Sequence, residues 1–353
     1  MSSSSKDWVE TLLLPLDRLR TSLLRACRSW IRPFIVGRDL RVAVGGGLML
    51  TFALVGTGLF PFWLLALGPI LLGVPHVVSD IRYLVVRTGA FRRKEMWLAA
   101  GVPLVIAGVG GGVQAGLVAA AGVLLVARGT SLRRWLGLAV VGGLWALAFS
   151  MGRSADLFFA HAHNFVAVLL WWGWRRRVSR LAWLPLLGFV LASGWILAGG
   201  LDALVFSTGS VYGSPSGLNL GYHASILAPG LSSPWDLRLV LLFAFAQSVH
   251  YSIWLRLLPD EDRPQDTPRT FGASYRALRQ DLGRWLLWGA LASALVVALW
   301  ATLDLAAARI GYLRMALFHG HLELAALAFL WMEGNTSIAT HHRHTDNKES
   351  STA

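Results

Sequence analysis

The sequence predicts an all-α protein, a polytopic bundle of about ten transmembrane helices with an amphipathic helix at its N-terminus. Composition is the first reason, because 55% of the 353 residues are hydrophobic and only 14% are charged, whereas a soluble domain has about 25% charged residues. The second reason is the recurrence of apolar runs of about 20 residues, the length at which a helix crosses the hydrocarbon core. The third is the position of the arginines, which fall mainly in alternate connections between these runs.

We expect three regions along the chain. Residues 1–42 carry Leu and Trp at helical spacing among arginines. This pattern predicts an amphipathic helix on the membrane surface, with a solvated basic leader as the alternative. Residues 43–333 form the transmembrane domain, and residues 334–353 form a polar cytoplasmic tail.

The transmembrane domain is expected to contain about ten spans. They lie near 43–60, 62–82, 96–111, 113–128, 134–151, 156–174, 181–206, 236–256, 284–306 and 312–332. The third and fourth are short and glycine-rich, so they form either a hairpin or one long irregular span. The Gly-, Ser- and Pro-rich segment Ser207–Pro234 is expected on the outer face, and the charged segment Leu257–Phe271 in the cytoplasm.

Positive charge orients the predicted bundle. The net charge of +13 has no nucleic-acid-binding motif beside it, so membrane lipids and not nucleic acids are the expected contacts. Arginines concentrate before the first span and after every second one, which predicts that both termini are cytoplasmic. Four arginines break this pattern. They are Arg153, Arg238, Arg309 and Arg314.

Four of the expected spans hold polar side chains in their interiors, where hydrocarbon offers no solvation and a polar residue indicates function. The residues are His76 and Asp80; His161, His163 and Asn164; Gln247, His250 and Tyr251; and His319, His321 and Glu323. A rise of 1.5 Å per residue places the six histidines in a slab roughly 10–12 Å thick. One shared site is therefore geometrically feasible.

Spacing limits which histidines can meet. Residues two apart on a regular helix point about 200° apart. Only one of His161 and His163, and only one of His319 and His321, is therefore expected to face a common centre. His163 is favoured because it lies nearer the midplane and beside the polar Asn164, whereas the second pair stays undecided.

Two carboxylates share a helix face with a histidine. Asp80 follows His76 by four residues, and Glu323 follows His319 by four. Such a carboxylate can accept the second N–H of a metal-bound imidazole, or it can ligate the metal directly.

The remaining residues restrict the chemistry. Cys27 is the only cysteine, so no thiolate site can form, and any metal is held by histidine, carboxylate or both. The tail histidines His341, His342 and His344 are interpreted as solvated. His223 can join the site only if the outer segment re-enters the membrane.

Four short motifs resemble those of the Brp/Blh family of membrane β-carotene 15,15'-dioxygenases. They are GVPHVVSD at 73–80, HAHNF at 161–165, SVHYSIWLRLLP at 248–259 and ALFHGHLELAAL at 316–327. Two features depart from the family pattern: Val77 replaces a glycine, and the second histidine after the aromatic run is absent.

The resemblance implies a non-haem Fe(II) oxygenase that uses O2 on a lipophilic, carotenoid-like substrate or another lipid. About four histidines are implied as ligands: His76, one of His161 and His163, His250, and one of His319 and His321. Asp80 and Glu323 would orient these ligands, while Tyr251 and Asn164 would line the substrate cavity.

Other functions fit the same residues. Histidines on facing helices can bind haem b in a transmembrane, quinone-linked oxidoreductase. Histidine and aspartate can also relay protons in a transporter, or hydrogen-bond between helices in a purely structural role.

Overall fold

The computed structural model describes residues 8–174, 179–263 and 265–334, and these ranges contain helices and no strand. Most of the expected tail, including its three histidines, therefore lies outside the described residues. The α-helices are α1 (Trp8–Ala26), α2 (Arg28–Val36), α3 (Arg38–Leu59), α4 (Pro61–Asp80), α5 (Lys94–Met96), α6 (Val102–Ile106), α7 (Gly112–Val126), α8 (Ser131–Met151), α9 (Ser154–Trp174), α10 (Trp183–Leu197), α11 (Asp202–Tyr212), α12 (Leu220–Leu227), α13 (Trp235–Ser252), α14 (Leu258–Glu261), α15 (Phe271–Leu303), α16 (Leu305–Met315) and α17 (Leu317–Glu333).

Within the described residues, eight helices are long and apolar enough to cross a membrane, so the chain is an all-α transmembrane bundle. They are Arg38–Leu59, Pro61–Val86, Lys94–Val126, Ser131–Met151, Arg180–Leu197, Trp235–Glu261, Phe271–Leu303 and Leu305–Glu333. The helix α9 also has spanning length, but its two histidines and its asparagine lower its mean hydropathy.

The glycine-rich helix Lys94–Val126 is a hairpin, one of the two predicted arrangements. Its reversal lies at Gly110, whose φ of 106° is accessible to glycine but strained for other residues. The arm before the reversal packs along α7, where a Cβ at Gly122 would meet the backbone of Ala99. The two arms correspond to the third and fourth expected spans.

Two further boundaries differ from the expected ones. The span expected to reach residue 206 ends at Leu197, because Gly199 adopts a left-handed φ of 91° that terminates the helix. Arg238 hydrogen-bonds the Leu197 carbonyl and pairs with Asp202 there. The last span begins at Leu305 and not near residue 312, since the Asp304 side chain caps α16. The residues between 305 and 312 therefore lie inside the bundle and not in a loop.

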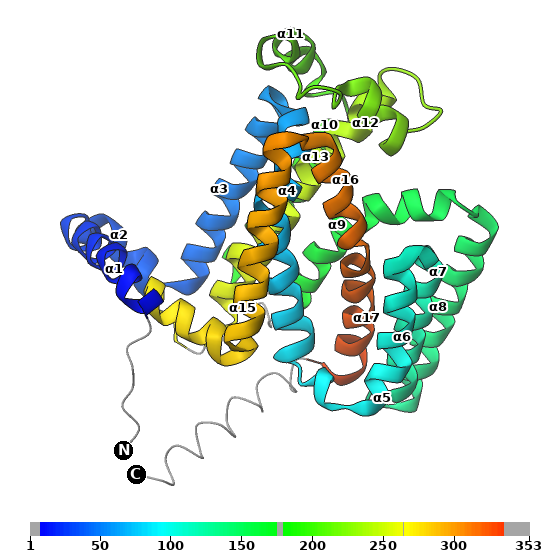
Figure 1. The fold of residues 1–353 in the computed structure, drawn as a ribbon, viewed down its shortest axis with the longest axis horizontal. Coiled ribbons are helices and arrows are strands. Elements are labelled where there is room, and N and C mark those ends of the chain that lie inside the picture. Colours follow the sequence, from blue (N-terminus) through cyan, green and yellow to red (C-terminus); the bar gives the residue numbers. More distant parts are fainter. Residues whose placement is uncertain (1–7, 175–178, 264, 335–353) are drawn as a thin grey trace.

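Helices α1 and α2 project from the side of the bundle, as Figure 1 shows. Several large apolar side chains of α1 are exposed, as expected for an amphipathic helix. The Asp17 carboxylate accepts hydrogen bonds from the backbone N–H groups of Phe271 and Gly272 at the start of α15. Partial burial acts to raise the pKa of Asp17, but these hydrogen bonds outweigh it and hold the pKa below its ordinary value.

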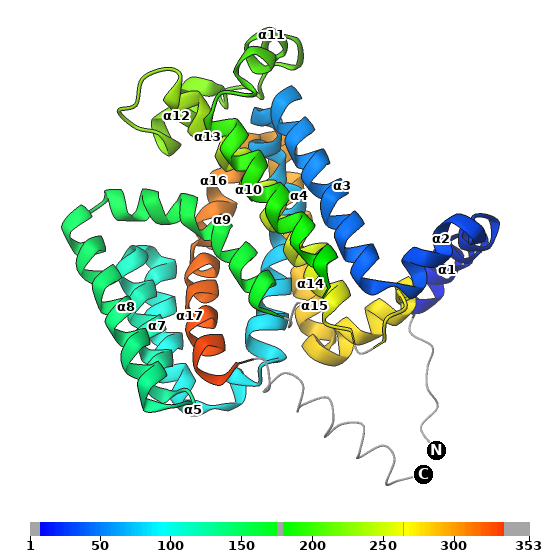
Figure 2. The ribbon, with the colours of Figure 1, turned by 180° about the vertical axis from the view of Figure 1, so that it is seen from behind.

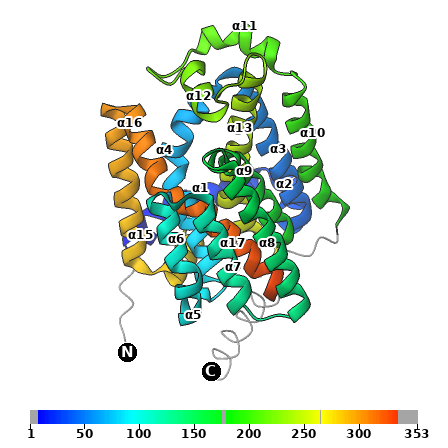
Figure 3. The ribbon, with the colours of Figure 1, turned by 90° about the vertical axis from the view of Figure 1, so that its right-hand side faces the viewer.

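Helix α13 is the centre of the bundle. Of the apolar stretch that could span the membrane in Trp235–Glu261, 78% is buried, against 6% of the corresponding stretch in α15. It packs against α3, α4, α9, α10 and α12, and Figure 3 shows α9 and α13 between α10 on one side and α15 and α16 on the other. Seen from behind in Figure 2, α17 separates the α5–α8 group from this centre. A polar residue on α13 therefore points into protein and not into lipid.

Charged groups join the helix ends on the face opposite α11 and α12. Arg41 makes two hydrogen bonds to the Asp260 carboxylate, of 2.8 and 3.0 Å, linking α3 to α14. Arg93 pairs with Glu333 and also donates to the Val126 carbonyl, which links the hairpin to α17. These contacts fix the relative heights of the helices that carry the histidines.

Candidate metal centre

The polar residues of the four spans come from α4, α9, α13 and α17. Helix α13 packs against α4 and α9, and α17 packs against both of these helices. The Ser79 hydroxyl donates to the Trp254 carbonyl at 2.7 Å, which joins α4 to α13 beside the site. Beyond it, α4 continues as the π-helix Ile81–Val86 and α13 as the π-helix Ile253–Leu257. Such π-helical turns are frequent at functional sites.

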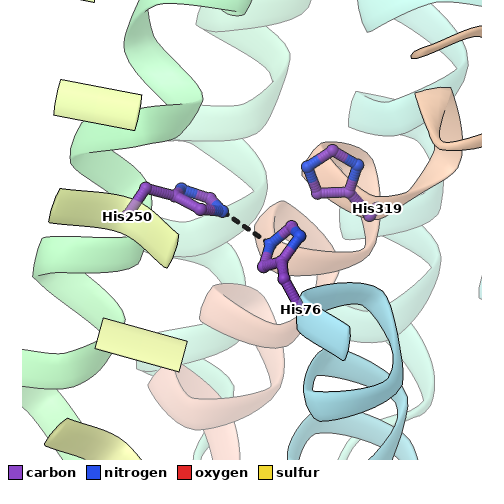
Figure 4. Close-up of side chains that lie close together, drawn as sticks. All are labelled: His76, His250 and His319. Carbon is purple, nitrogen blue, oxygen red and sulfur yellow. Dashed lines mark hydrogen bonds between the residues drawn. The ribbon is translucent and has the colours of Figure 1, made fainter. Parts of the chain in front are cut away.

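Three imidazoles converge at the centre of the bundle, as shown in Figure 4. The Nε2 atoms of His76 and His250 are 2.7 Å apart. Ligand nitrogens of His76, His250 and His319 all lie within 4.8 Å of one another. The first two side chains are fully buried, at 0% and 1% exposure. This spacing brings lone pairs from three helices to one point.

His163 completes a group of four imidazoles. Its ring centroid lies 5.2 Å from that of His250 and 5.4 Å from that of His319. The Nδ1–H of His163 donates to the Ala160 carbonyl at 2.8 Å, and His319 makes the same kind of contact to Ala316. A carbonyl can only accept, so both Nε2 atoms are left as acceptors. Backbone anchoring of one ring nitrogen is usual for metal-bound histidine.

The two carboxylates contact the same imidazole nitrogens that face the centre. Asp80 Oδ2 lies 3.3 Å from His76 Nε2, and Glu323 Oε1 lies 3.3 Å from His250 Nε2. A carboxylate that only orients a ligand accepts from the opposite ring nitrogen. The geometry therefore favours direct ligation by Asp80 and Glu323, which was one of the two predicted roles. Glu323 also partners His250 and not His319, its neighbour in sequence.

The other members of the two histidine pairs point elsewhere. His161 Nε2 donates to the Leu227 carbonyl at 2.8 Å, and its ring meets Phe243 edge-on. His321 stacks on Phe159 with ring centroids 4.7 Å apart. The structure therefore brings neither into the group of four, the result expected of residues two apart on a regular helix. His223 is buried but stacks on Phe62, away from the group.

A cavity of about 490 Å³ opens onto the imidazoles. Its lining includes His163, His250, His319 and His321, and also Asn164 and Tyr251. The Tyr251 ring lies 5.1 Å from that of His76, and its hydroxyl accepts a hydrogen bond from Gln247 at 2.9 Å. Ile226 and Leu317 also line the cavity and are each about half exposed, at 48% and 47%. The cavity therefore reaches the outer surface of the bundle.

Comparisons of the chain with family models, with curated proteins and with solved structures find no match.

The donor set fits a divalent metal ion. Both Asp80 oxygens and Glu323 Oε2 are buried without a hydrogen-bond partner among the described residues. Buried carboxylates are paired or coordinate metals, because an isolated buried charge is very costly. Two carboxylates and one divalent cation give a neutral group, and imidazole with carboxylate suits Fe(II), Mn(II) or Zn(II).

Two residues of the site escaped the sequence reasoning. Trp254 donates its indole N–H to Glu323 Oε1 at 2.7 Å, although the sequence pattern gave Trp254 no role at the site. Arg309 lines the cavity, but the expected start of the last span left it in a loop. The signal for Arg309 was a lone charge within the apolar stretch LAAARIGYL.

Proposed function

We propose that the protein is a membrane-embedded, histidine-ligated non-haem Fe(II) oxygenase that acts on a lipophilic substrate. Three imidazoles converge within 4.8 Å, with the His163 ring beside them, and two buried carboxylates each keep at least one oxygen without a hydrogen-bond partner among the described residues; this convergence carries the proposal. His76, His163, His250 and His319 would hold the metal, with Asp80 and Glu323 as further oxygen ligands. This donor set is larger than one ion requires, so the metal analysis tests whether the protein binds one iron ion or two.

The ring spacing favours a bare metal ion over haem. The centroids of His76, His250 and His319 are separated by 4.7–6.0 Å. A porphyrin between axial histidines needs a wide flat slot on both sides of the iron, whereas these rings contact one another. Haem b therefore fits the site less well than a single ion.

Iron would supply the activation of O2, which protein side chains cannot provide. The chain itself would bind and orient the substrate and exclude water. Gln247 fixes the Tyr251 hydroxyl beside the metal ligands, while Asn164 Oδ1 is buried and free to accept a hydrogen bond from a ligand. A second cavity of about 450 Å³ next to α17 has an entirely apolar lining, which suits a lipophilic chain.

We further infer residence in the bacterial inner membrane with both termini cytoplasmic. The support is the arginine-rich character of the face that carries Arg41, Arg93 and Arg134, opposite α11 and α12. A carotenoid-like polyene and another membrane lipid are the two substrate classes that the Brp/Blh resemblance and the cavity suggest.

Metal analysis of the purified full chain tests the proposal. We expect iron without a Soret band, and a nitric-oxide adduct of the Fe(II) protein detectable by electron paramagnetic resonance. His76→Ala and His250→Ala should lose this iron, because an incomplete ligand set binds far more weakly. His161→Ala is the matched control and should keep it.

The opposite results are equally clear. A Soret band would replace the oxygenase by a haem-b oxidoreductase. A protein that binds no transition metal after anaerobic reconstitution with Fe(II) would leave a transporter or a structural role for the histidines.

A further inference from the structure

Arg309 is a buried guanidinium that has no carboxylate partner among the described residues. Its side chain on α16 is only 5% exposed. The other described arginines with less than a tenth of their surface exposed each pair with an aspartate. These pairs are Arg38 with Asp266, Arg41 with Asp260, and Arg82 with Asp281. For Arg309, the described residues provide no such ion pair.

One N–H of Arg309 has a structural role. Its Nε donates to the Leu65 carbonyl at 2.8 Å. This carbonyl would ordinarily accept from the residue four positions later, but that residue is Pro69, which has no N–H. A single neutral donor could satisfy Leu65 equally well. The positive charge of the guanidinium is therefore not explained by this contact.

The unexplained charge faces the cavity of the metal centre. Arg309 lines that cavity together with His250 and His319. Its neighbours are two phenols: Tyr222, whose hydroxyl takes part in a side-chain hydrogen bond with the guanidinium, and Tyr251. A phenol hydroxyl is an uncharged acceptor, so the hydrogen bond to Tyr222 does not neutralise the positive charge. Because the Tyr251 ring is 5.1 Å from that of His76, a chain that leaves Arg309 and passes Tyr251 reaches the imidazoles within the same cavity.

The other charged residues of the cavity leave Arg309 unneutralised. Asp156 accepts a hydrogen bond from the Val113 N–H at 2.7 Å, at the start of α7, and makes no ion pair with Arg309. Arg314 also lines the cavity but is exposed. Asp80 and Glu323 are not among the lining residues and face the imidazoles instead.

We propose that this cavity binds a long-chain carboxylic acid, with the carboxylate held by Arg309 and the chain extending to the imidazoles. A guanidinium presents parallel N–H donors that match a carboxylate in a bidentate pair. One buried positive charge neutralises one carboxylate, whereas a phosphate monoester carries up to two negative charges and would need a second buried cation. The proposal rests on the proposed function, because it defines the substrate class of the same site.

The inference narrows the substrate from lipophilic molecules in general to amphiphilic ones. A hydrocarbon polyene has no group that could satisfy the charge of Arg309. An acid anchored there would present a carbon of its chain, and not its carboxylate, to the metal ligands. The anchor would thus determine which carbon of the chain reacts.

Equilibrium binding to the purified full chain tests this inference. Displacement of radiolabelled palmitate is measured at pH 8 with palmitate, methyl palmitate and lysophosphatidic acid as competitors. We expect palmitate to bind at least about tenfold more tightly than its methyl ester, because charge-assisted hydrogen bonds are lost in the ester. Lysophosphatidic acid should bind more weakly than palmitate.

Three variants locate the effect. Arg309→Gln keeps a donor for Leu65 but removes the charge, and it should lower palmitate affinity about 10–100-fold while leaving methyl palmitate unchanged. Arg309→Lys keeps the positive charge but removes the parallel N–H donors of the guanidinium. This variant should retain a reduced preference for the acid over the ester. Arg153→Gln removes an exposed charge between α8 and α9 and should change neither affinity.

Equal binding of acid and ester by the wild-type protein would overturn the inference, even if Arg309→Gln failed to fold. So would a preference that survives in Arg309→Gln, or tighter binding of lysophosphatidic acid. Iron content is measured on the same samples. Bound iron without selectivity for the acid would refute this inference alone. Selectivity for the acid without any bound metal would refute the proposed oxygenase but support the carboxylate site.

Discussion

His161 and His163 provide the sharpest test of the metal centre. They lie two positions apart on α9, yet their replacement should have opposite effects on iron binding. The His163 ring lies 5.2 Å from that of His250 and 5.4 Å from that of His319. Removing even a supporting residue beside a metal ligand lowers metal affinity about 10–100-fold. We therefore expect His163→Ala to lower Fe(II) affinity by more than about 100-fold.

His161→Ala should produce the reverse pattern. It removes one hydrogen bond, of 2.8 Å to Leu227, together with an edge contact to Phe243. A hydrogen bond of this kind contributes about 0.5–1.5 kcal/mol to stability, which lowers Tm by no more than about 2–4 °C in a chain of this size. Iron content should remain at the wild-type level.

The assay is iron stoichiometry after dialysis against a graded series of chelator concentrations, with Tm measured on the same samples. His319→Ala and His321→Ala repeat the comparison on α17, where only the first should lose metal. Equal loss of iron in His161→Ala and His163→Ala would refute the reasoning. It would mean that α9 is not a regular helix at the site, or that a second metal ion binds there.

Three further predictions concern helix packing, the docking of α1 and the membrane topology. Gly73→Ala should destabilise the protein by about 1–3 kcal/mol in denaturant unfolding, because its Cβ would lie 2.2 Å from Tyr312 Cζ; an unchanged midpoint would contradict this packing. Asp17 should stabilise the docking of α1 on α15 fully above its ordinary pKa of 3.8, and this stabilisation should be lost as pH falls through its lower folded-state pKa. Amide hydrogen exchange in α1 should therefore accelerate in that pH range, and Asp17→Asn should remove the pH dependence. A topology reporter inserted near Ser214 should read extracytoplasmic and one near Arg128 cytoplasmic; the same side for both would contradict the span count between them.

The helix Lys94–Val126 shows where sequence patterning stopped being informative. Apolar composition predicted membrane helices on either side of the glycine-rich stretch, but it fitted a hairpin and a long irregular span equally well. The reversal depends on the positive φ of Gly110 and on the close approach of Ala99 to Gly122. Both are properties of the packed arms and not of either arm alone.

The candidate site, too, could be predicted from the sequence only in part. The sequence alone identified the four spans with polar interiors, because a polar residue in hydrocarbon has few inexpensive explanations. Helical periodicity further predicted that one member of each histidine pair would face away. It could not select His319 over His321, since that choice depends on the rotation of α17 against α7 and α9.

The all-helical transmembrane class and the approximate positions of the spans can be predicted from the sequence, since composition and the length of apolar runs are local quantities. Which side chains meet one another depends on how the helices pack. Glu323 meets His250 and not His319, and Arg309 enters the cavity because Asp304 starts α16 one turn before it. Such pairings depend on helix rotation, height and tilt, which arise from side-chain packing between segments far apart in the chain.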